Sequence, residues 1–336
     1  MGLLAVYCMA KVAVKFTCFQ SQSLDVWRNL AIEEYLLTQL GEEDLFLFLW
    51  RSRLALVIGR NQNPWRECRW RDLEEAGGML ARRISGGGTV YQDEGNLNFA
   101  FMMRRDHYDQ QALSALVVEA LLSLGLPVHL GARSVIYLGE HKVSGNAFCL
   151  RRGVALHHGT LLIKADLGNL QNWLRPSLAG LTGRGIASVP SPVKNLAEAR
   201  RGLKWEEVAE SLIATVAKQH GEPTRRATGI LDPAALLGLR SKQASLDWRF
   251  GETPEFAFTL ALPDLPPLQL TVRHGRLTAV LPGDASPAGA ALAPVIAKLW
   301  LGVILRATVL ADCLREDDTG DPRLAACADW LEEQPF

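Results

Sequence analysis

Three consecutive glycines, Gly86, Gly87 and Gly88, interrupt a stretch of strand-forming residues and constrain this chain more than any other feature. Glycine has no β-carbon, so a triplet weakens a helix or strand interior and lets the backbone approach a ligand closely. Arg82 and Arg83 stand shortly before the triplet. Guanidinium groups bind carboxylates and phosphates through paired hydrogen bonds, so the sequence predicts a loop that binds an anionic ligand.

The apolar pattern on both sides of this loop predicts an α+β fold. Residues 45–50 and 54–59 are two apolar runs, which we interpret as buried strands of one hairpin. Further strands are predicted at 79–83, 89–91, 98–103, 134–138 and 159–163, and helices at 24–40, 66–76, 110–124 and 205–218. No G-x-G-x-x-G motif opens a helix and no P-loop motif is present, which excludes those two nucleotide-binding folds.

Length and pattern together predict the domain organisation. A chain of 336 residues is expected to form two domains. The pattern loosens from Gly221 to Ala244, around Gly221-Glu222-Pro223, Asp232-Pro233 and Ser241-Lys242. We therefore predict an N-terminal extension over 1–17, a larger domain over 18–221, a linker over 222–245 and a small domain over 246–336. The small domain should contain three strands, with a tight turn at 273–276, and a final helix pair.

The charge balance excludes partners that are recognised by a global field. The 36 Lys and Arg residues match 36 Asp and Glu residues, so we expect no nucleic-acid or membrane partner. No apolar run approaches the ~20 residues that cross a bilayer. Six cysteines without C-x-x-C spacing are typical of reduced thiols and support no metal-ligating set. We expect a cytoplasmic protein, or a mitochondrial matrix protein if residues 1–17 are a targeting leader.

Two further polar clusters follow the glycines. Lys142 precedes Ser144 and Gly145, and its ammonium group can stabilise negative charge on a phosphate or an acyl carbonyl. A solvated surface lysine is the alternative. His157 and His158 are neighbours on a predicted strand, so their side chains point to opposite faces and cannot both bind one metal ion. One of the two histidines is therefore expected to be structural.

In this order, the three clusters resemble the lipoate-protein ligase A family and its relative, the mitochondrial lipoyltransferase. The resemblance is carried by NLAIEE at 29–34, VIGRNQNPW at 57–65, RRISGGG at 82–88, KVSG at 142–145, HHGTLL at 157–162 and SVPSPVKNL at 188–196. The segment WRFGETPEF at 248–256 is similar to the start of the family's C-terminal domain. The resemblance implies a biotin/lipoate-ligase-like catalytic domain with a mixed β-sheet, followed by a small α+β accessory domain.

The resemblance also implies an activity and a set of site residues. It implies a lipoate-protein ligase that uses ATP to form lipoyl-AMP from lipoate, or the octanoate analogue. The lipoyl group then passes to a lysine on lipoyl domains of 2-oxoacid dehydrogenase E2 subunits or on the glycine cleavage H protein. Lys142 would be catalytic and would contact both the acyl carbonyl and the phosphate of the adenylate. The implied binding residues for lipoyl-AMP and substrate are Arg83, Ser85, Gly86, Gly87, Gly88, Thr89, Gln92, His158, Gly159 and Thr160.

Two departures from the family pattern leave an alternative open. Gln92 stands where the family often has histidine; it can form hydrogen bonds but carries no charge. Arg133 and Ser134 stand where many ligases have an Asn-Asp pair, which weakens the case for bound Mg²⁺. The alternative is a lipoyl or octanoyl transferase that uses preformed lipoyl-AMP or an acyl carrier protein donor. A non-catalytic protein that binds lipoate or a carrier is a third alternative, which the combined positive charge of Arg82, Arg83 and Lys142 disfavours.

Overall fold

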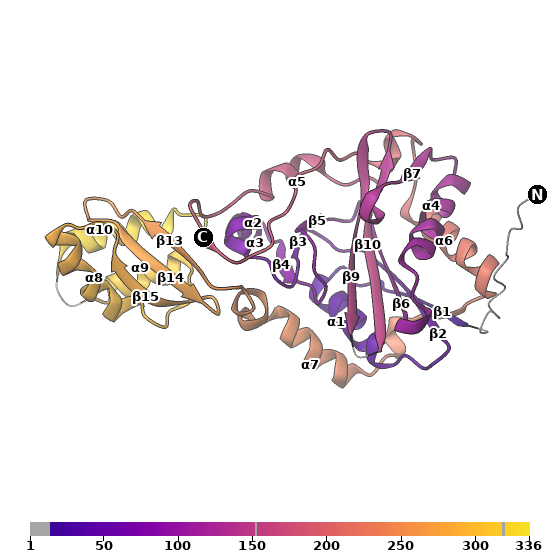
Figure 1. Ribbon diagram of the computed structural model, residues 1–336, viewed down its shortest axis with the longest axis horizontal. Coiled ribbons are helices and arrows are strands. Elements are labelled where there is room, and N and C mark those ends of the chain that lie inside the picture. Colours follow the sequence, from indigo (N-terminus) through magenta and orange to yellow (C-terminus); the bar gives the residue numbers. More distant parts are fainter. Residues whose placement is uncertain (1–13, 152, 318–319) are drawn as a thin grey trace, which may run out of the picture. The chain divides into compact units, whose positions relative to one another are not determined.

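The computed structural model describes residues 14–151, 153–317 and 320–336 (Figure 1). Within it the chain divides into two compact units, each assembled from segments far apart in the sequence. The first unit contains Met1–Ser52, Glu94–Ala165 and Ser191–Leu239, and the second contains Arg53–Asp93, Asp166–Pro190 and Arg240–Phe336. These units divide the chain differently from the domains expected from the sequence, whose boundaries stay predictions. Most of the expected N-terminal extension, and with it the leader hypothesis, lies outside the described residues.

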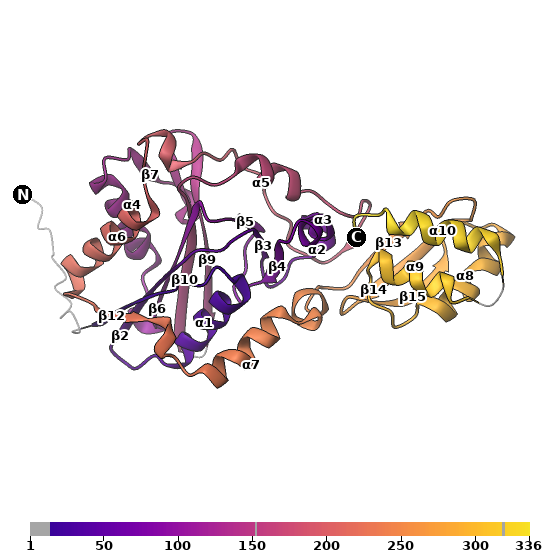
Figure 2. The ribbon, with the colours of Figure 1, turned by 180° about the vertical axis from the view of Figure 1, so that it is seen from behind.

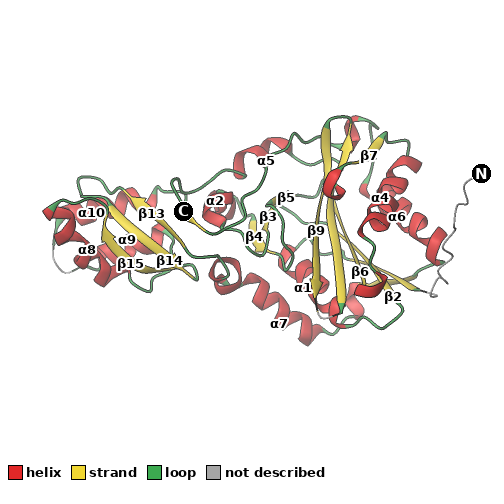
Figure 3. Cartoon of the chain, viewed as in Figure 1, coloured by secondary structure: helices red, strands yellow, loops and turns green. Residues whose placement is uncertain are grey.

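An eight-stranded mixed sheet forms the framework of the first unit (Figure 3). Its strands, in spatial order, are β12 (Thr224–Ala227), β1 (Lys15–Gln20), β2 (Asp44–Trp50), β6 (Asn96–Arg104), β10 (Val154–Leu162), β9 (His141–Arg151), β8 (Ile136–Leu138) and β7 (Val128–Leu130). Strand β1 is parallel to β2 and to β12, whereas every other neighbouring pair in this sheet is antiparallel.

Helices cover both faces of this sheet, as Figures 1 and 2 show. They are α1 (Val26–Thr38), α4 (Gln110–Ser123) and α6 (Trp205–His220). In β2, Leu45, Leu47 and Leu49 join the apolar core that α4 and α6 complete. Because side chains alternate along a strand, Trp50 points to the other face, where its indole Nε1 donates to Glu33 of α1 at 3.1 Å.

The second unit contains two smaller sheets and one continuous apolar core. Its three-stranded sheet has the order β4 (Met79–Arg82), β3 (Ala55–Ile58), β5 (Val90–Gln92), and its four-stranded sheet has the order β11 (Thr182–Gly183), β13 (Phe256–Leu260), β14 (Leu268–Arg273), β15 (Arg276–Pro282). The helices are α2 (Pro64–Glu67), α3 (Trp70–Glu75), α5 (Leu167–Trp173), α8 (Pro287–Trp300), α9 (Ala307–Arg315) and α10 (Pro322–Glu332). Trp65, Trp70 and Phe250 are buried together in the core. The ring centroid of Phe250 lies 4.9 Å from that of Trp70 and 5.3 Å from that of Trp65.

The mixed α+β fold is confirmed, and so are most predicted elements. The turn at 273–276 is a tight hairpin in which His274 and Gly275 have φ angles of 52° and 71°. The predicted helix over 66–76 is two short helices, α2 and α3, and three helices follow β15 instead of a pair. None of the helices in the described residues has the length and apolar character that spanning a bilayer requires.

The predicted hairpin at 45–59 is wrong. Strand β2 pairs with β1 and β6, whereas β3 pairs with β4 and β5 in a different sheet. Both runs are buried on two sides, so their composition identifies them as strands but does not say which strands they pair with. The segment at 222–245, expected as a linker, contains β12 and the whole of helix α7 (Pro233–Ala244).

Candidate functional site

Arg83 holds the glycine loop from within the second unit. The residue follows β4 and is 5% exposed. Its guanidinium Nη2 donates to the carbonyl oxygens of Gly86 and Gly88, each at 2.7 Å, and Nη1 donates to the carbonyl oxygen of Val57 at 2.9 Å. Its Nε donates to Ser85 Oγ at 3.1 Å. The guanidinium group thereby fixes the path of the loop by binding its carbonyl groups.

With its carbonyl groups bound by Arg83, the loop keeps its N–H groups available for a ligand. In the described part of the chain, the N–H groups of Gly86, Gly87 and Gly88 donate no hydrogen bond. A β-carbon added to Gly86 would meet no atom within 4 Å. Gly87 has a φ of 86°, which side chains other than hydrogen disfavour. Successive N–H groups around such a residue form a concave anion site, so the loop is suited to phosphate or carboxylate oxygens.

A polar network that the sequence analysis did not identify fixes the far end of the loop. Gln62 Oε1 accepts the N–H of Gly59 at 2.8 Å and the hydroxyl of Thr89 at 3.0 Å. Ser188 Oγ accepts the N–H of Thr89 at 2.9 Å and donates to the carboxylate of Glu67. Gln62 and Glu67 are both buried. The segments that contain Gln62 and Ser188 carry the family resemblance, but residue spacing alone does not reveal these contacts.

Arg82, the other arginine before the glycines, serves a structural purpose. It is fully buried, and its Nη2 donates to the carbonyl oxygen of Arg249 at 2.7 Å and to Thr253 Oγ1 at 2.8 Å. Its Nη1 donates to the carbonyl oxygens of Arg60 and Gln62 at 2.9 and 2.8 Å. Burial lowers the pKa of Arg82 to about 9, so the group remains charged at neutral pH. It joins the turn after β3 to the segment after α7.

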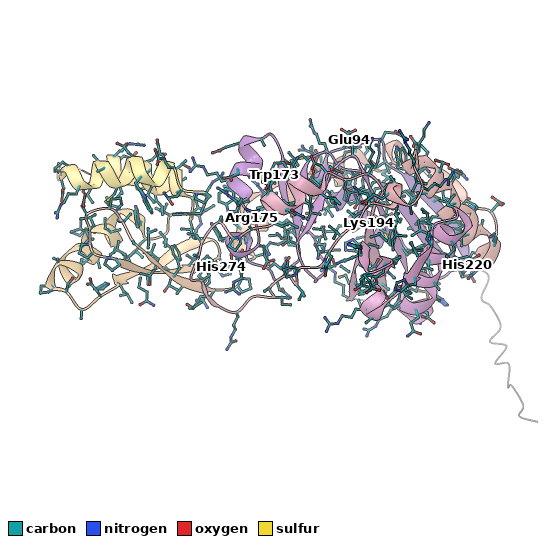
Figure 4. The ribbon with its side chains drawn as sticks, turned by 90° about the horizontal axis from the view of Figure 1, so that it is seen from above. Glu94, Trp173, Arg175, Lys194, His220 and His274 are labelled. Atoms are coloured by element: carbon teal, nitrogen blue, oxygen red, sulfur yellow. The ribbon has the colours of Figure 1, made fainter. Side chains whose placement is uncertain are left out.

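Lys142 stands at the start of β9 in the first unit. Its N–H donates to the carbonyl oxygen of Pro192 at 2.9 Å, and its carbonyl oxygen accepts the N–H of Lys194 at 3.1 Å. A β-carbon added to Gly145 would lie 3.4 Å from Lys142 Nζ, so the glycine gives the ammonium group room. Figure 4 labels Lys194 on this segment. Two backbone hydrogen bonds thus fix the position of the lysine.

His158 belongs to a buried polar cluster on β10. Its Nδ1 lies 2.8 Å from Glu33 Oε2, and Trp50 donates to the other oxygen of the same carboxylate. Glu33 is 2% exposed, and it was not identified as a site residue from the sequence. Two residues further along β10, Thr160 donates to Asn98 Oδ1 at 2.8 Å. The carboxylate of Glu33 orients the imidazole ring of His158.

His157 is the structural member of the histidine pair. It is fully buried, and its ring lies 4.6 Å from the ring of Phe148 and within 6.3 Å of those of Phe99, Phe101 and Tyr108. Neither ring nitrogen has a hydrogen-bond partner among the described residues. Burial lowers the pKa of His157 to about 3, so the imidazole is neutral at physiological pH.

The remaining predicted positions fall in the two units as follows. Gln92 is buried at the end of β5 in the second unit. Gly159 lies on β10 in the first unit, where an added β-carbon would overlap Asn146 and Phe99, so strand packing requires the glycine. The glycine loop therefore lies in the second unit, whereas Lys142 and residues 158–160 lie on neighbouring strands of the first.

The segment that departs from the family pattern has an unusual backbone. Arg133 and Ser134 have φ angles of 56° and 60°, in the left-handed region. Gln110 donates to Ser134 Oγ at 3.0 Å, and the carbonyl oxygen of Ser134 accepts the side chain of Asn146. No group of three or more His, Cys, Asp and Glu side chains among the residues that the structure describes could hold a metal ion.

Comparisons with known proteins identify the family. Residues 25–217 match the family described as the lipoyl protein ligase A/B catalytic domain. This match covers more than half of the chain, and the chain belongs to that family.

Solved structures share the fold. The structure of LipL1 from P. falciparum in complex with lipoate is 23% identical and has a TM-score of 0.63, covering 95% of this chain and 100% of that one. A lipoate-protein ligase A bound with ATP is 24% identical, with a TM-score of 0.57 over 69% and 94% of the two chains. A bipartite lipoate protein ligase from Thermoplasma acidophilum, described with its E2 lipoyl domain, is 23% identical, with a TM-score of 0.60 over 70% and 96%.

Proposed function

We propose that this chain is a lipoate-protein ligase. It would use ATP to convert lipoate into lipoyl-AMP and then pass the lipoyl group to a lysine of lipoyl domains in 2-oxoacid dehydrogenase E2 subunits or of the glycine cleavage H protein. Membership of the lipoyl ligase family supports the reaction class. Three relatives of the same fold, described with lipoate, with ATP and with an E2 lipoyl domain, support the choice of substrates.

The observation that carries the proposal is the glycine loop held by Arg83. In the first step a lipoate carboxylate oxygen attacks the α-phosphorus of ATP, and pyrophosphate leaves. Negative charge accumulates on the phosphoryl oxygens, and the N–H groups of Gly86, Gly87 and Gly88 can donate hydrogen bonds to it. Because Arg83 fixes the loop before the ligand arrives, these donors need little rearrangement during the reaction.

Lys142 would act in the second step. The acceptor amine attacks the acyl carbonyl, an amide bond forms, AMP leaves and the amine loses a proton. The carbonyl oxygen becomes negative as the bond forms, and an ammonium group held by a fixed backbone stabilises that charge. Lys142 forms no covalent bond in this scheme.

A lipoyltransferase is the second candidate, and residues 131–135 favour it. Arg133 and Ser134 offer a cation and a hydroxyl, whereas Mg²⁺ prefers carboxylate oxygens. These residues do not fit a magnesium site, so no step is assigned to a metal there. A transferase would still use the loop and Lys142, but it would receive lipoyl-AMP ready-made or take an acyl group from a carrier protein.

One set of assays separates the two candidates. The purified protein is incubated with ATP, Mg²⁺, lipoate and an apo lipoyl domain, each omitted in turn, and the mass of the domain is followed. A ligase must also catalyse lipoate-dependent exchange between ATP and pyrophosphate without any acceptor. Modification from synthetic lipoyl-AMP without exchange would identify a transferase. Absence of modification from either donor would refute both.

A further inference from the structure

A hollow of about 640 Å³ opens on the first unit, and its edge is basic. Three exposed cations line it, Lys164, Arg201 and Lys204, together with one carboxylate, Glu198. We call the three cations the basic rim. None of them takes part in the chemistry described above.

The acids that flank the basic rim are engaged elsewhere. The carboxylate of Glu198 lies 3.6 Å from the ammonium group of Lys194, and that of Glu207 lies 2.6 Å from the guanidinium of Arg200. Within the described residues, no carboxylate forms an ion pair with a member of the basic rim. The three cations of the rim are therefore not held in ion pairs with acids of the described residues, although Glu207 lies close enough to Lys204 to interact with its charge.

This charge is local, because the chain as a whole is neutral. Residues 191–204 contain four basic residues and one acidic residue, against 36 of each over the full sequence. Arg51 adds to the same surface. Its guanidinium lies 4.4 Å from the ring centroid of Trp205, the first residue of α6, and donates to the carbonyl oxygen of Glu94, labelled in Figure 4. A local concentration of one charge attracts an oppositely charged partner even when the net charge is zero.

The hollow is built on the same segment that positions Lys142. Lys142 pairs through its backbone with Pro192 and Lys194. The next residue, Asn195, lines the hollow, and its side-chain amide binds both backbone groups of Ala165 at 2.8 and 2.9 Å. A partner that settles on the basic rim is therefore held against the framework that fixes Lys142.

We propose that the basic rim docks the acidic surface of the protein whose lysine receives the lipoyl group, an inference that rests on the proposed function. An acidic protein surface suits the rim better than a small anion, because the nearby hydrogen-bond donors at Asn195 and Lys204 are already used. The amide of Asn195 binds Ala165, and the N–H of Lys204 donates to Glu207. What remains is a set of long, exposed cations, which steer a charged protein surface and give a salt-dependent association rate.

The test measures transfer to an apo lipoyl domain from synthetic lipoyl-AMP, so that ATP activation plays no part. The variant Lys164→Glu with Arg201→Glu reverses two rim charges. Its matched control is Arg226→Glu with Lys298→Glu, which makes the same change in net charge at two exposed positions that do not line the hollow. At low salt the rim variant should raise the KM for the acceptor domain about tenfold while kcat changes less than about twofold. The difference should shrink at about 0.5 M salt.

Each other result overturns the inference in a distinguishable way. A rim variant with a KM within twofold of the wild-type value shows that the surface does not dock the acceptor. An equal rise in the control variant shows a net-charge effect. Binding of a duplex oligonucleotide by the wild type and not by the rim variant, with an unchanged acceptor KM, would assign the surface to nucleic acid. Wild-type protein that modifies no acceptor from lipoyl-AMP would remove the proposed function itself.

Discussion

Acidification should destabilise the first unit through His157, and replacing this residue should remove that sensitivity. The imidazole is fully buried among aromatic rings, and burial lowers its pKa from 6.5 to about 3. The titratable groups beside it are Tyr108 and His158, and burial raises the pKa of Tyr108 to about 12. Only the unfolded chain therefore binds a proton at this position between about pH 3 and 6.5, and stability falls as the pH drops through that window.

The size of the effect follows from the two pKa values. At pH 8 His157 is neutral in both states and contributes no pH dependence. At pH 5, about 1.5 units below the pKa of 6.5 in the unfolded chain, protonation of His157 stabilises the unfolded state. Each unit is worth ~1.36 kcal/mol, so the free energy of unfolding of the first unit should fall by about 2 kcal/mol. In His157→Phe this loss should disappear. The absolute stability of the variant can shift in either direction, because phenylalanine removes an unpaired polar group but is larger than histidine.

The measurement is urea-dependent pulse proteolysis at pH 8 and pH 5, with peptides of the first unit quantified by mass spectrometry. The quantity compared is the change in unfolding free energy between the two pH values. The contributions of titratable groups that the wild type and the variant share cancel in this comparison. His129→Phe is the control, because this histidine is exposed on β7 and meets water before and after unfolding. If His157→Phe loses as much stability on acidification as the wild type, to within about 0.5 kcal/mol, the argument from burial is refuted.

Four further substitutions test the site and the buried arginine beside it. Lys142→Ala should slow lipoyl transfer at least about 100-fold with little change in melting temperature, because a partly exposed ammonium group contributes little to a core; near-wild-type turnover would contradict its role. Gly86→Ala should keep the wild-type melting temperature yet weaken calorimetric binding of a lipoyl-AMP mimic about tenfold, whereas Gly87→Ala should also lose about 1 kcal/mol of stability at its φ of 86°. Arg82→Met should destabilise by about 3–5 kcal/mol in urea titrations, since buried carbonyl groups lose their donor.

Local pattern was sufficient to predict most helices and strands, but not how they combine. The helix at 205–218 and the hairpin around 273–276 depend on residues close in sequence, and both are confirmed. The pairing of β2 with β1 and β6 depends on contacts across about 30 to 60 positions, which an apolar run cannot specify. The same limitation applies to β12, which adds a parallel edge strand to the sheet from a region whose loose pattern resembled a linker.

The candidate site shows a similar division. The loop and Lys142 were identified because glycine triplets and motif lysines are recognisable as short segments. Glu67 and Ser188 were missed as residues that fix the loop, because they meet across 121 positions of the sequence and neither local segment shows that the two are partners. Glu33 was missed as a partner of His158 for the same reason, since 125 positions separate the two residues.

Two pairs of identical neighbours show what alternation along a strand can and cannot predict. His157 and His158 point to opposite faces of β10, as expected, and only the packing shows that one ring lies among aromatic side chains and the other beside Glu33. Arg82 and Arg83 divide in the same way at the end of β4, one toward the segment after α7 and one toward the glycines. The sequence predicts this separation for the histidines, whereas both arginines were expected to bind one anionic ligand, and the chemistry of each face comes from distant residues. Substituting the first member of each pair should therefore change mainly stability, whereas substituting the second should change mainly ligand binding.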